Sequence, residues 1–175
     1  MKPVLVVTAR VGSTRCPHKV MRPICRMPMI GLLLARVANA RLMDQIVLAT
    51  SEDPRNNPLA DYVRGLGYSV YRGSENDVLD RYYQAARDAK ADTVVRITGD
   101  CPLIDPALVD AVIAKFHSSG EDYASNISPP SYPDGLDTEV FAYRALETAW
   151  NEARAPRDRE HVTPFIRESG VFRQA

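Results

Sequence analysis

Cysteine is scarce in this sequence: 175 residues include only Cys16, Cys25 and Cys101. Their number is odd and they are scattered, without the paired spacing of a metal site. This pattern argues against a disulfide framework and is typical of a protein from a reducing compartment. We therefore expect a cytoplasmic protein that is stabilised by a hydrophobic core.

A long apolar run is also missing. The longest, from Met27 to Leu34, is too short to span a bilayer and is interrupted by Pro28 and Gly31. The N-terminus has one lysine before a strand-like run and no small-residue cleavage site, so we expect no signal peptide. Length and composition are ordinary for a globular protein, with 45% hydrophobic and 25% charged residues. They predict one domain over residues 1–175 and no association with a membrane.

Acidic residues are absent before Asp44. The basic residues of the same segment are Lys2, Arg10, Arg15, Lys19, Arg22, Arg26, Arg36 and Arg41. The whole chain is nevertheless balanced, with 22 basic and 22 acidic residues. The positive field is therefore local to the N-terminal segment. This favours a small phosphorylated ligand and argues against nucleic acid as the partner.

Apolar runs alternate with segments of helical spacing. Strands are predicted at 4–8, 46–50, 68–71, 93–98 and 139–141, and helices at 29–42, 57–66, 77–90, 106–117, 145–155 and 159–168. This alternation predicts an α/β fold, in which helices cover both faces of a mostly parallel sheet. Ligands of such folds bind beyond the carboxyl ends of the strands. The loops after Thr8, Thr50, Tyr71 and Thr98 are therefore the candidate binding loops.

The first of these loops, residues 9–19, is rich in small residues and cations. Small residues let the backbone approach phosphate oxygens, and the loop amides can donate to them. Three cations are available to offset phosphate charge: Arg10, Arg15 and Lys19. A P-loop is excluded because its lysine follows a glycine, whereas Lys19 follows His18. A dinucleotide fingerprint is excluded because it needs three spaced glycines, and Gly12 is the only glycine of residues 9–19. The simpler alternative is a basic surface loop.

Asp100 follows the strand at 93–98, which is apolar enough to be buried on both faces. A carboxylate there needs a partner, because burying it unpaired is costly. A divalent metal that bridges to phosphates is one such partner. Asp105 is better explained as the N-cap before Pro106, and Cys101 as a packing residue.

A third candidate segment contains three carboxylates in six residues: Asp134, Asp137 and Glu139. They can bind a metal, pair with arginines or accept hydrogen bonds from sugar hydroxyls. The alternative is a turn at Asp134-Gly135 with solvated acids. Residues 72–75, after the third strand, either reach a nucleotide base or cap the helix from Asp77. We interpret His161 as structural.

Taken together, these segments resemble the cytidylyltransferases that activate acidic and related sugars. The most similar branch is named for spore-coat polysaccharide biosynthesis and is akin to the acylneuraminate and 3-deoxy-manno-octulosonate cytidylyltransferases. The resemblance rests on blocks in order along nearly the whole chain: ARVGSTR (9–15) with Lys19, VLATS (47–51), RGSENDVL (72–79), VRITGDCPLID (95–105), DYASN (122–126), YPDGLDTEVF (132–141) and REHVTP (159–164).

The resemblance implies a glycosyltransferase-A-like, Rossmann-like nucleotidyltransferase fold, the use of CTP and Mg²⁺, and a homodimer. It implies that a sugar oxygen attacks the α-phosphate of CTP and pyrophosphate leaves, giving a CMP-sugar for polysaccharide or glycan synthesis. It assigns Arg10, Ser13, Arg15 and Lys19 to the triphosphate, Ala9, Thr50, Ser51, Arg72 and Gly73 to the base pocket, Asp100 to Mg²⁺, and Asp137 and Glu139 to the sugar. The residues expected to be catalytic are Lys19, Arg10 and Asp100.

The sequence also departs from the resembled family. Family members usually have glycine at the position of His18 and in the turn at Cys25-Arg26. They usually continue into a further strand that ends in a second acidic metal ligand, and we expect residues 1–175 to lack that segment. Two alternatives stay open: a sugar-phosphate transferase that uses GTP or UTP, and a truncated, non-catalytic nucleotide-binding domain.

Overall fold

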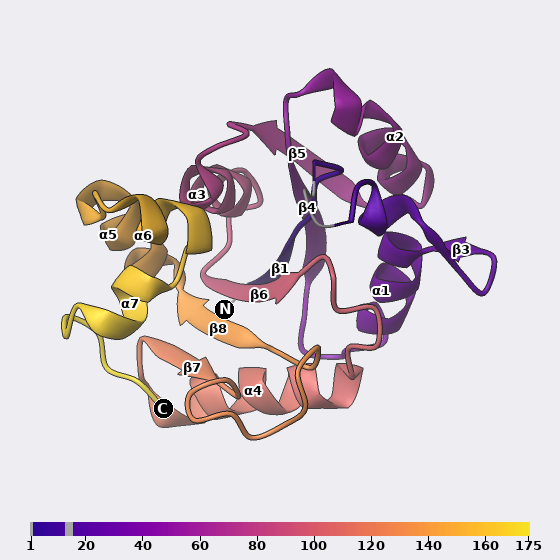
Figure 1. Ribbon diagram of the computed structural model, residues 1–175. Coiled ribbons are helices and arrows are strands. Elements are labelled where there is room, and N and C mark those ends of the chain that lie inside the picture. The colour runs from indigo at the N-terminus through magenta and orange to yellow at the C-terminus, as the bar shows by residue number, and fades with distance from the viewer. Residues whose placement is uncertain (1, 13–15) are drawn as a thin grey trace.

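A six-stranded sheet in the order β5-β4-β1-β6-β8-β7 forms the centre of the computed structural model, which describes residues 2–12 and 16–175 (Figure 1). Its strands are β1 (Pro3–Thr8), β4 (Gln45–Ser51), β5 (Ser69–Gly73), β6 (Thr93–Thr98), β7 (Tyr123–Ser125) and β8 (Glu139–Ala142). Strands β5, β4, β1 and β6 pair in parallel, whereas β8 runs antiparallel to both β6 and β7. The prediction of a mostly parallel sheet is confirmed.

Helices cover both faces of the sheet, as predicted. They are α1 (Met29–Val37), α2 (Asn57–Gly65), α3 (Val78–Asp88), α4 (Pro106–Ser119), α5 (Tyr143–Glu152), α6 (Pro156–His161) and α7 (Pro164–Glu168). Alternate residues of β1 point to opposite faces: Leu5 and Val7 join the core under α1, α2 and α4. Val4 and Val6 join the core under α3, α5 and α7. The central strand is therefore buried on both sides, as its continuous apolar run requires.

Side-chain caps fix the starts of two helices near the carboxyl edge of the sheet. Asp77 accepts a hydrogen bond from the Asp80 amide at 2.9 Å, and Asp105 accepts one from the Ala107 amide at 2.8 Å. The predicted N-cap role of Asp105 is confirmed. At α2 the N-cap position belongs to Asn56, so Asn57 is the first helical residue.

Three local predictions were wrong. Helix α1 ends at Val37 and not at residue 42, because Asn39 donates from its side chain to the carbonyls of Ala35 and Arg36. Strand β7 lies where no strand was predicted, and it pairs with β8. The single helix predicted over 159–168 is two helices: α6 begins earlier, at Pro156, and ends at His161, and α7 begins at Pro164.

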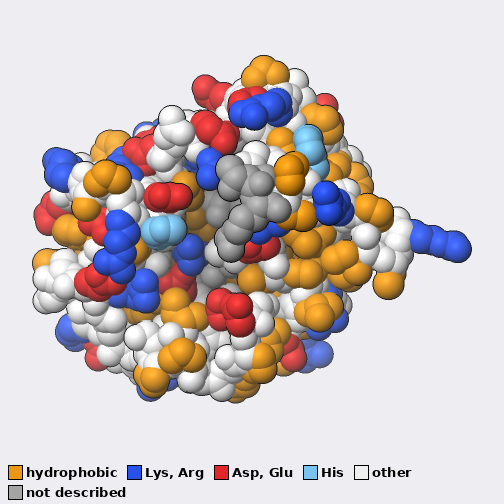
Figure 2. Space-filling model, viewed as in Figure 1, with side chains coloured by type: hydrophobic (Ala, Val, Ile, Leu, Met, Phe, Trp, Pro, Cys, Tyr) orange, Lys and Arg blue, Asp and Glu red, His pale blue; other side chains and the backbone are white. Residues whose placement is uncertain are grey.

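A small hairpin, β2 (Pro23–Ile24) with β3 (Met27–Pro28), leaves the sheet on the α1 side and projects at the right of Figures 1 and 2. Its two turn residues, Cys25 and Arg26, have φ values of 50° and 71°. Two-residue hairpins of this kind need positive φ at both positions, which favours Asn and Gly. This explains why the resembled family has glycine here.

Within the described ranges, every helix falls short of the length and apolarity that crossing a bilayer would need.

Candidate active site

The loops after β1 and β6 meet at the carboxyl edge of the sheet. The Gly99 amide donates to the Thr8 carbonyl at 2.9 Å, which closes the two loops against each other. A Cβ at residue 99 would lie 2.7 Å from both the Thr8 carbonyl oxygen and the Ala9 Cβ. Because real Cβ atoms do not approach so closely, the glycine is required for this contact.

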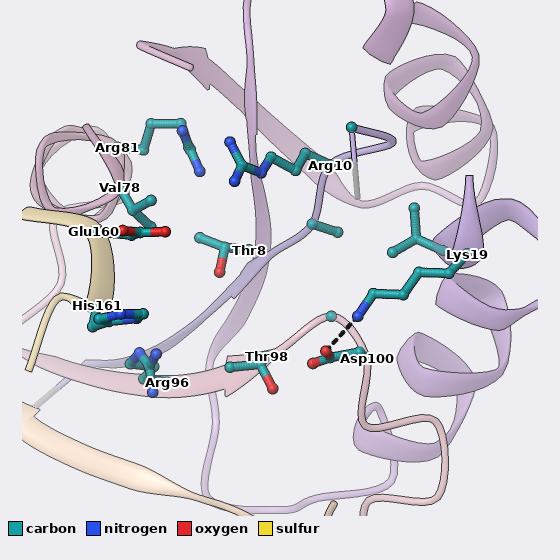
Figure 3. A pocket seen from close by; sticks show the side chains of 14 residues that line it. Thr8, Arg10, Lys19, Val78, Arg81, Arg96, Thr98, Asp100, Glu160 and His161 are labelled. Atoms are coloured by element: carbon teal, nitrogen blue, oxygen red, sulfur yellow. Dashed lines mark hydrogen bonds and ion pairs between the residues drawn. The ribbon is translucent and has the colours of Figure 1, made fainter. Parts of the chain in front are cut away.

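A cavity of about 390 Å³ opens beside these loops. Its lining residues are Thr8, Ala9, Arg10, Gly12, Lys19, Val20, Val78, Arg81, Arg96, Thr98, Gly99, Asp100, Glu160 and His161. Figure 2 shows acidic, basic and histidine side chains close together on this face of the molecule. We call the part formed by Arg10, Lys19 and Asp100 the loop end, and the part formed by Arg96, Glu160 and His161 the helix end (Figure 3).

At the loop end, Lys19 and Asp100 form an ion pair with an Nζ–Oδ2 distance of 2.7 Å (Figure 3). Lys19 begins a 3₁₀ turn, η1 (Lys19–Met21), after His18, whose φ of 57° is unusual for a residue other than glycine. Burial raises the pKa of Asp100, but hydrogen bonds from Lys19 and Thr98 outweigh that effect and keep the pKa below its usual range. Asp100 is therefore an ionised carboxylate, and its side chain is 47% exposed.

A second cation of the loop end, Arg10, pairs with Glu75 at 3.0 Å. Arg81 of α3 lines the cavity beside it and is only 2% exposed. Arg81 donates to the backbone carbonyls of Ser74 and Glu75, and burial lowers its pKa. Its Nε has no hydrogen-bond partner among the described residues. Residues 74–75 are thus held against α3 by Arg81 and against the first loop by Arg10.

At the helix end, Arg96 of β6 pairs with Glu139 of β8, and Glu139 also accepts a hydrogen bond from the Tyr123 hydroxyl at 2.7 Å. Glu139 is 1% exposed. Burial lowers the pKa of Arg96, but the neighbouring Glu139 carboxylate outweighs that effect and raises it. The Arg96 Nε is buried without a partner in the described part of the chain. An anion in the cavity therefore meets a fixed guanidinium at this point.

Glu160 and His161, the last residues of α6, point into the helix end from the side opposite the loops (Figure 3). The interpretation of His161 as structural placed it outside the site, whereas the structure has it exposed at the cavity wall. Arg81 and Arg96 were likewise not predicted as site residues. Arg96 and His161 lie within two blocks that carry the family resemblance, 95–105 and 159–164, whereas Arg81 lies two residues beyond the block 72–79 and no sequence signal marked it.

Among the predicted site residues, Ala9, Arg10, Lys19 and Asp100 come together in this cavity. Ser13 and Arg15 lie outside the described residues. The residues predicted for the base pocket after β4 and β5 do not line the cavity; they are Thr50, Ser51, Arg72 and Gly73. Thr50 and Ser51 are fully buried, and Arg72 donates to the Ser51 carbonyl and to Asn57.

The two predicted sugar-side carboxylates differ from each other. Glu139 has its oxygens engaged by Arg96 and Tyr123, as described above. Asp137 is half-buried, and burial together with the charges of Asp134, Glu139 and Asp100 raises its pKa. Asp137 does not line the cavity.

A metal ion fits this site at Asp100. In the described ranges no cluster of three or more His, Cys, Asp or Glu side chains is arranged to hold a metal. Asp100 is nevertheless ionised, half-exposed and in the cavity wall, where it pairs with Lys19. Mg²⁺ commonly takes one or two carboxylates and completes its shell with phosphate oxygens and water. The Asp100 carboxylate therefore suits a cation that binds together with a polyphosphate, whose oxygens supply further ligands.

Comparison with known proteins decides the family. The sequence profile described as "Cytidylyltransferase" matches residues 4–174. The chain belongs to the cytidylyltransferase family. It is 33% identical over 169 residues to the spore coat polysaccharide biosynthesis protein SpsF of Bacillus subtilis, covering 94% of this chain and 69% of that protein. Over 111 residues it is 37% identical to the 3-deoxy-manno-octulosonate cytidylyltransferase of Geobacter sulfurreducens, covering 62% of this chain and 43% of that protein.

A solved cytidylyltransferase from Leptospira borgpetersenii superposes with a TM-score of 0.94 at 32% identity, covering 99% of this chain and 74% of that one. The resemblance stated from the sequence blocks is therefore confirmed. As a cytidylyltransferase, the protein is an enzyme of nucleotidyl transfer with a Rossmann-like α/β fold.

Proposed function

We propose that this cytidylyltransferase couples CTP to an acidic sugar, forming a CMP-sugar and pyrophosphate. The observation that carries the proposal is the cavity itself, which has two cations and an ionised carboxylate at its loop end and Arg96 with His161 at its helix end. Arg10 and Lys19 of the loop end can pair with a triphosphate, and Arg96 of the helix end can pair with a carboxylated sugar. The relatives named for spore-coat polysaccharide and for 3-deoxy-manno-octulosonate support this reading.

The reaction forms one phosphorus–oxygen bond, breaks another and releases a proton. A hydroxyl oxygen of the sugar bonds to the α-phosphorus, the bond from that phosphorus to the bridging oxygen of the β-phosphate breaks, and the hydroxyl proton is released. Arg10 and Lys19 bind the phosphates and neutralise charge that grows on the leaving pyrophosphate. In this proposal Ser13 and Arg15 belong to the same group.

Asp100 is proposed to hold Mg²⁺, which supplies charge neutralisation at the phosphates when bound. Lys19, now paired with Asp100, is then released to the triphosphate. Asp137 is proposed to face the sugar. The contacts of the base are proposed for Ala9, which lines the cavity, and for Arg72 and Gly73, which lie outside its lining and precede the residues 74–75 that Arg81 holds.

The helix end is proposed to bind the sugar. Arg96 presents a guanidinium that Glu139 holds from behind, and His161 and Glu160 supply hydrogen-bonding groups for hydroxyls. The proposal includes the homodimer implied by the family resemblance and the cytoplasmic location expected from the cysteine pattern. Light scattering coupled to size-exclusion chromatography tests the dimer.

Pyrophosphate release tests the activity. The purified chain is assayed with each of the four common NTPs, with and without Mg²⁺, against 3-deoxy-manno-octulosonate, N-acetylneuraminate and neutral hexose phosphates. We expect release with CTP and an acidic sugar in the presence of Mg²⁺. Activity with GTP or UTP and a sugar phosphate would replace the proposal by the first alternative. Nucleotide binding without release under any condition would favour a non-catalytic domain.

A further inference from the structure

The residue after His161 has an unusual backbone. Val162 has φ 73° and ψ −58°, and the Thr163 amide donates to the His161 carbonyl at 2.9 Å, two residues back. This is a γ-turn of the rare positive-φ type, which is strained. Positive φ is a genuine outlier for a β-branched residue. The Val162 side chain is fully buried, so packing holds the turn in place.

An ion pair ties the same helix to α3. Arg159 donates to Asp77 Oδ2 from Nε at 3.0 Å and from Nη2 at 2.5 Å, and its Nη1 donates to the Trp150 carbonyl at 2.8 Å. Asp77 is itself fixed, because its other oxygen caps α3. Arg159 thus joins three elements, α3, α5 and α6, which lie together at the left of Figure 1. Its side chain is 22% exposed and does not line the cavity.

We propose that Arg159 is a positioning residue that, with the turn at Val162, holds His161 at the helix end of the cavity. Strained backbone persists only where the surroundings over-determine it, and such strain clusters at ligand clamps. Here the bend at Val162 ends α6 at His161, and the fork of Arg159 fixes the preceding turn of the same helix. Without these two constraints, His161 is no longer held in the wall of the helix end. The part of this inference that concerns the sugar rests on the proposed function.

The chain offers a matched control on the same helix. Arg157 makes a bidentate ion pair with Glu168, at 2.7 and 2.6 Å, away from the cavity lining. Arg157→Ala therefore removes an ion pair from α6 without touching the tie to α3. Arg159→Ala removes that tie. Arg159→Lys keeps the charge toward Asp77 but loses the planar fork that reaches Trp150 as well.

The first readout is independent of activity. The chain has three histidines, His18, His117 and His161, so the imidazole signals in a ¹H–¹³C NMR spectrum of the full chain are few enough to assign. Arg159→Ala is expected to shift and broaden the His161 signal and to leave the other two in place. Arg159→Lys is expected to give a smaller shift, and Arg157→Ala none. If Arg159→Ala does not fold, the comparison of Arg159→Lys with Arg157→Ala still tests the positioning role of Arg159.

The second readout separates the two substrates. With 3-deoxy-manno-octulosonate or N-acetylneuraminate as the probe, Arg159→Ala is expected to raise the sugar KM about tenfold, the size of one lost charge-assisted contact. The calorimetric Kd for CTP is expected to stay within about twofold. An unmoved His161 signal, or equal effects of Arg157→Ala and Arg159→Ala, would overturn the positioning role. If the wild-type chain transfers CMP to no sugar, the proposed function fails, and the NMR series alone decides the role of Arg159.

Discussion

The two ends of the cavity hold their charges in different ways. At the loop end, the side chains of Lys19 and Asp100 are 30% and 47% exposed, and the pair joins two loops. At the helix end, Arg96 and Glu139 pair between two strands, with Glu139 buried and hydrogen-bonded to Tyr123. Exposed ion pairs contribute about 0–1 kcal/mol to the free energy of unfolding. Removing one partner from a buried pair lowers that free energy by about 3–5 kcal/mol.

This difference separates two tasks. The ion pairs of the loop end contribute little to stability. A polyanion can therefore bind Lys19, and its cation can bind Asp100, with little loss of stability. The pair at the helix end is part of the sheet, so Arg96 stays in one place whether or not a ligand is bound. The site therefore combines exchangeable charges, which we propose for the nucleotide, with a fixed charge, which we propose for the second substrate.

Glu139→Ala tests the structural side of this comparison and carries the largest expected effect. The substitution leaves Arg96 buried without its counter-ion, so the free energy of unfolding is expected to fall by about 3–5 kcal/mol. Urea denaturation followed by circular dichroism measures it. Lys19→Met is the control at the loop end and is expected to cost less than about 1 kcal/mol. Equal losses in the two variants would remove the distinction between the ends.

Asp100→Asn tests the functional side. It keeps the shape of the side chain but removes the charge proposed for the metal, so pyrophosphate release is expected to fall about 100-fold or more, since metal charge stabilisation is worth several kcal/mol. The melting temperature is expected to change little, because the carboxyl group is half-exposed. Asp105→Asn, at a helix cap, is the matched control and should retain activity. Normal turnover by Asp100→Asn would take this residue out of the mechanism.

Lys19→Met tests whether the loop end binds the phosphates of CTP. Loss of one charge-assisted contact is expected to weaken CTP binding about tenfold, which is about 1.4 kcal/mol. Calorimetry with cytidine, which has no phosphates, should give nearly the same Kd for variant and wild type. If the two ligands lose affinity equally, Lys19 does not contact the triphosphate.

Arg26→Gly has the smallest expected effect and concerns strain outside the cavity. A positive φ costs a residue with a Cβ about 1–2 kcal/mol, so glycine in the β2–β3 turn is expected to stabilise the fold by about 1 kcal/mol. Arg22→Gly, at an exposed position with φ −67°, is the control and should be neutral or destabilising. Chemical denaturation of both variants gives the comparison, and a destabilised Arg26→Gly would show that the arginine makes a compensating contact.

Much of the fold could be predicted from local sequence. The apolar runs of β1 and β6 specify strands buried on both faces, and Asp77 and Asp105 specify helix starts through their own hydrogen bonds. Because parallel strands bring their carboxyl ends to one edge, the cations of the first loop and Asp100 were predicted to lie together. The structure has Arg10, Lys19 and Asp100 in one cavity, and Arg15 lies outside the described residues.

What the sequence alone did not determine are the partners of those side chains. Arg96 meets Glu139 across 43 residues and Arg10 meets Glu75 across 65, because β8 inserts antiparallel beside β6 and α3 packs next to β1. His161 reaches the cavity only because α6 ends at a strained turn against α3. Local periodicity carries no information on strand order or on helix docking. The sequence by itself thus determined the elements and the edge at which the site forms, while the tertiary structure decided which charges are fixed and which are free to exchange.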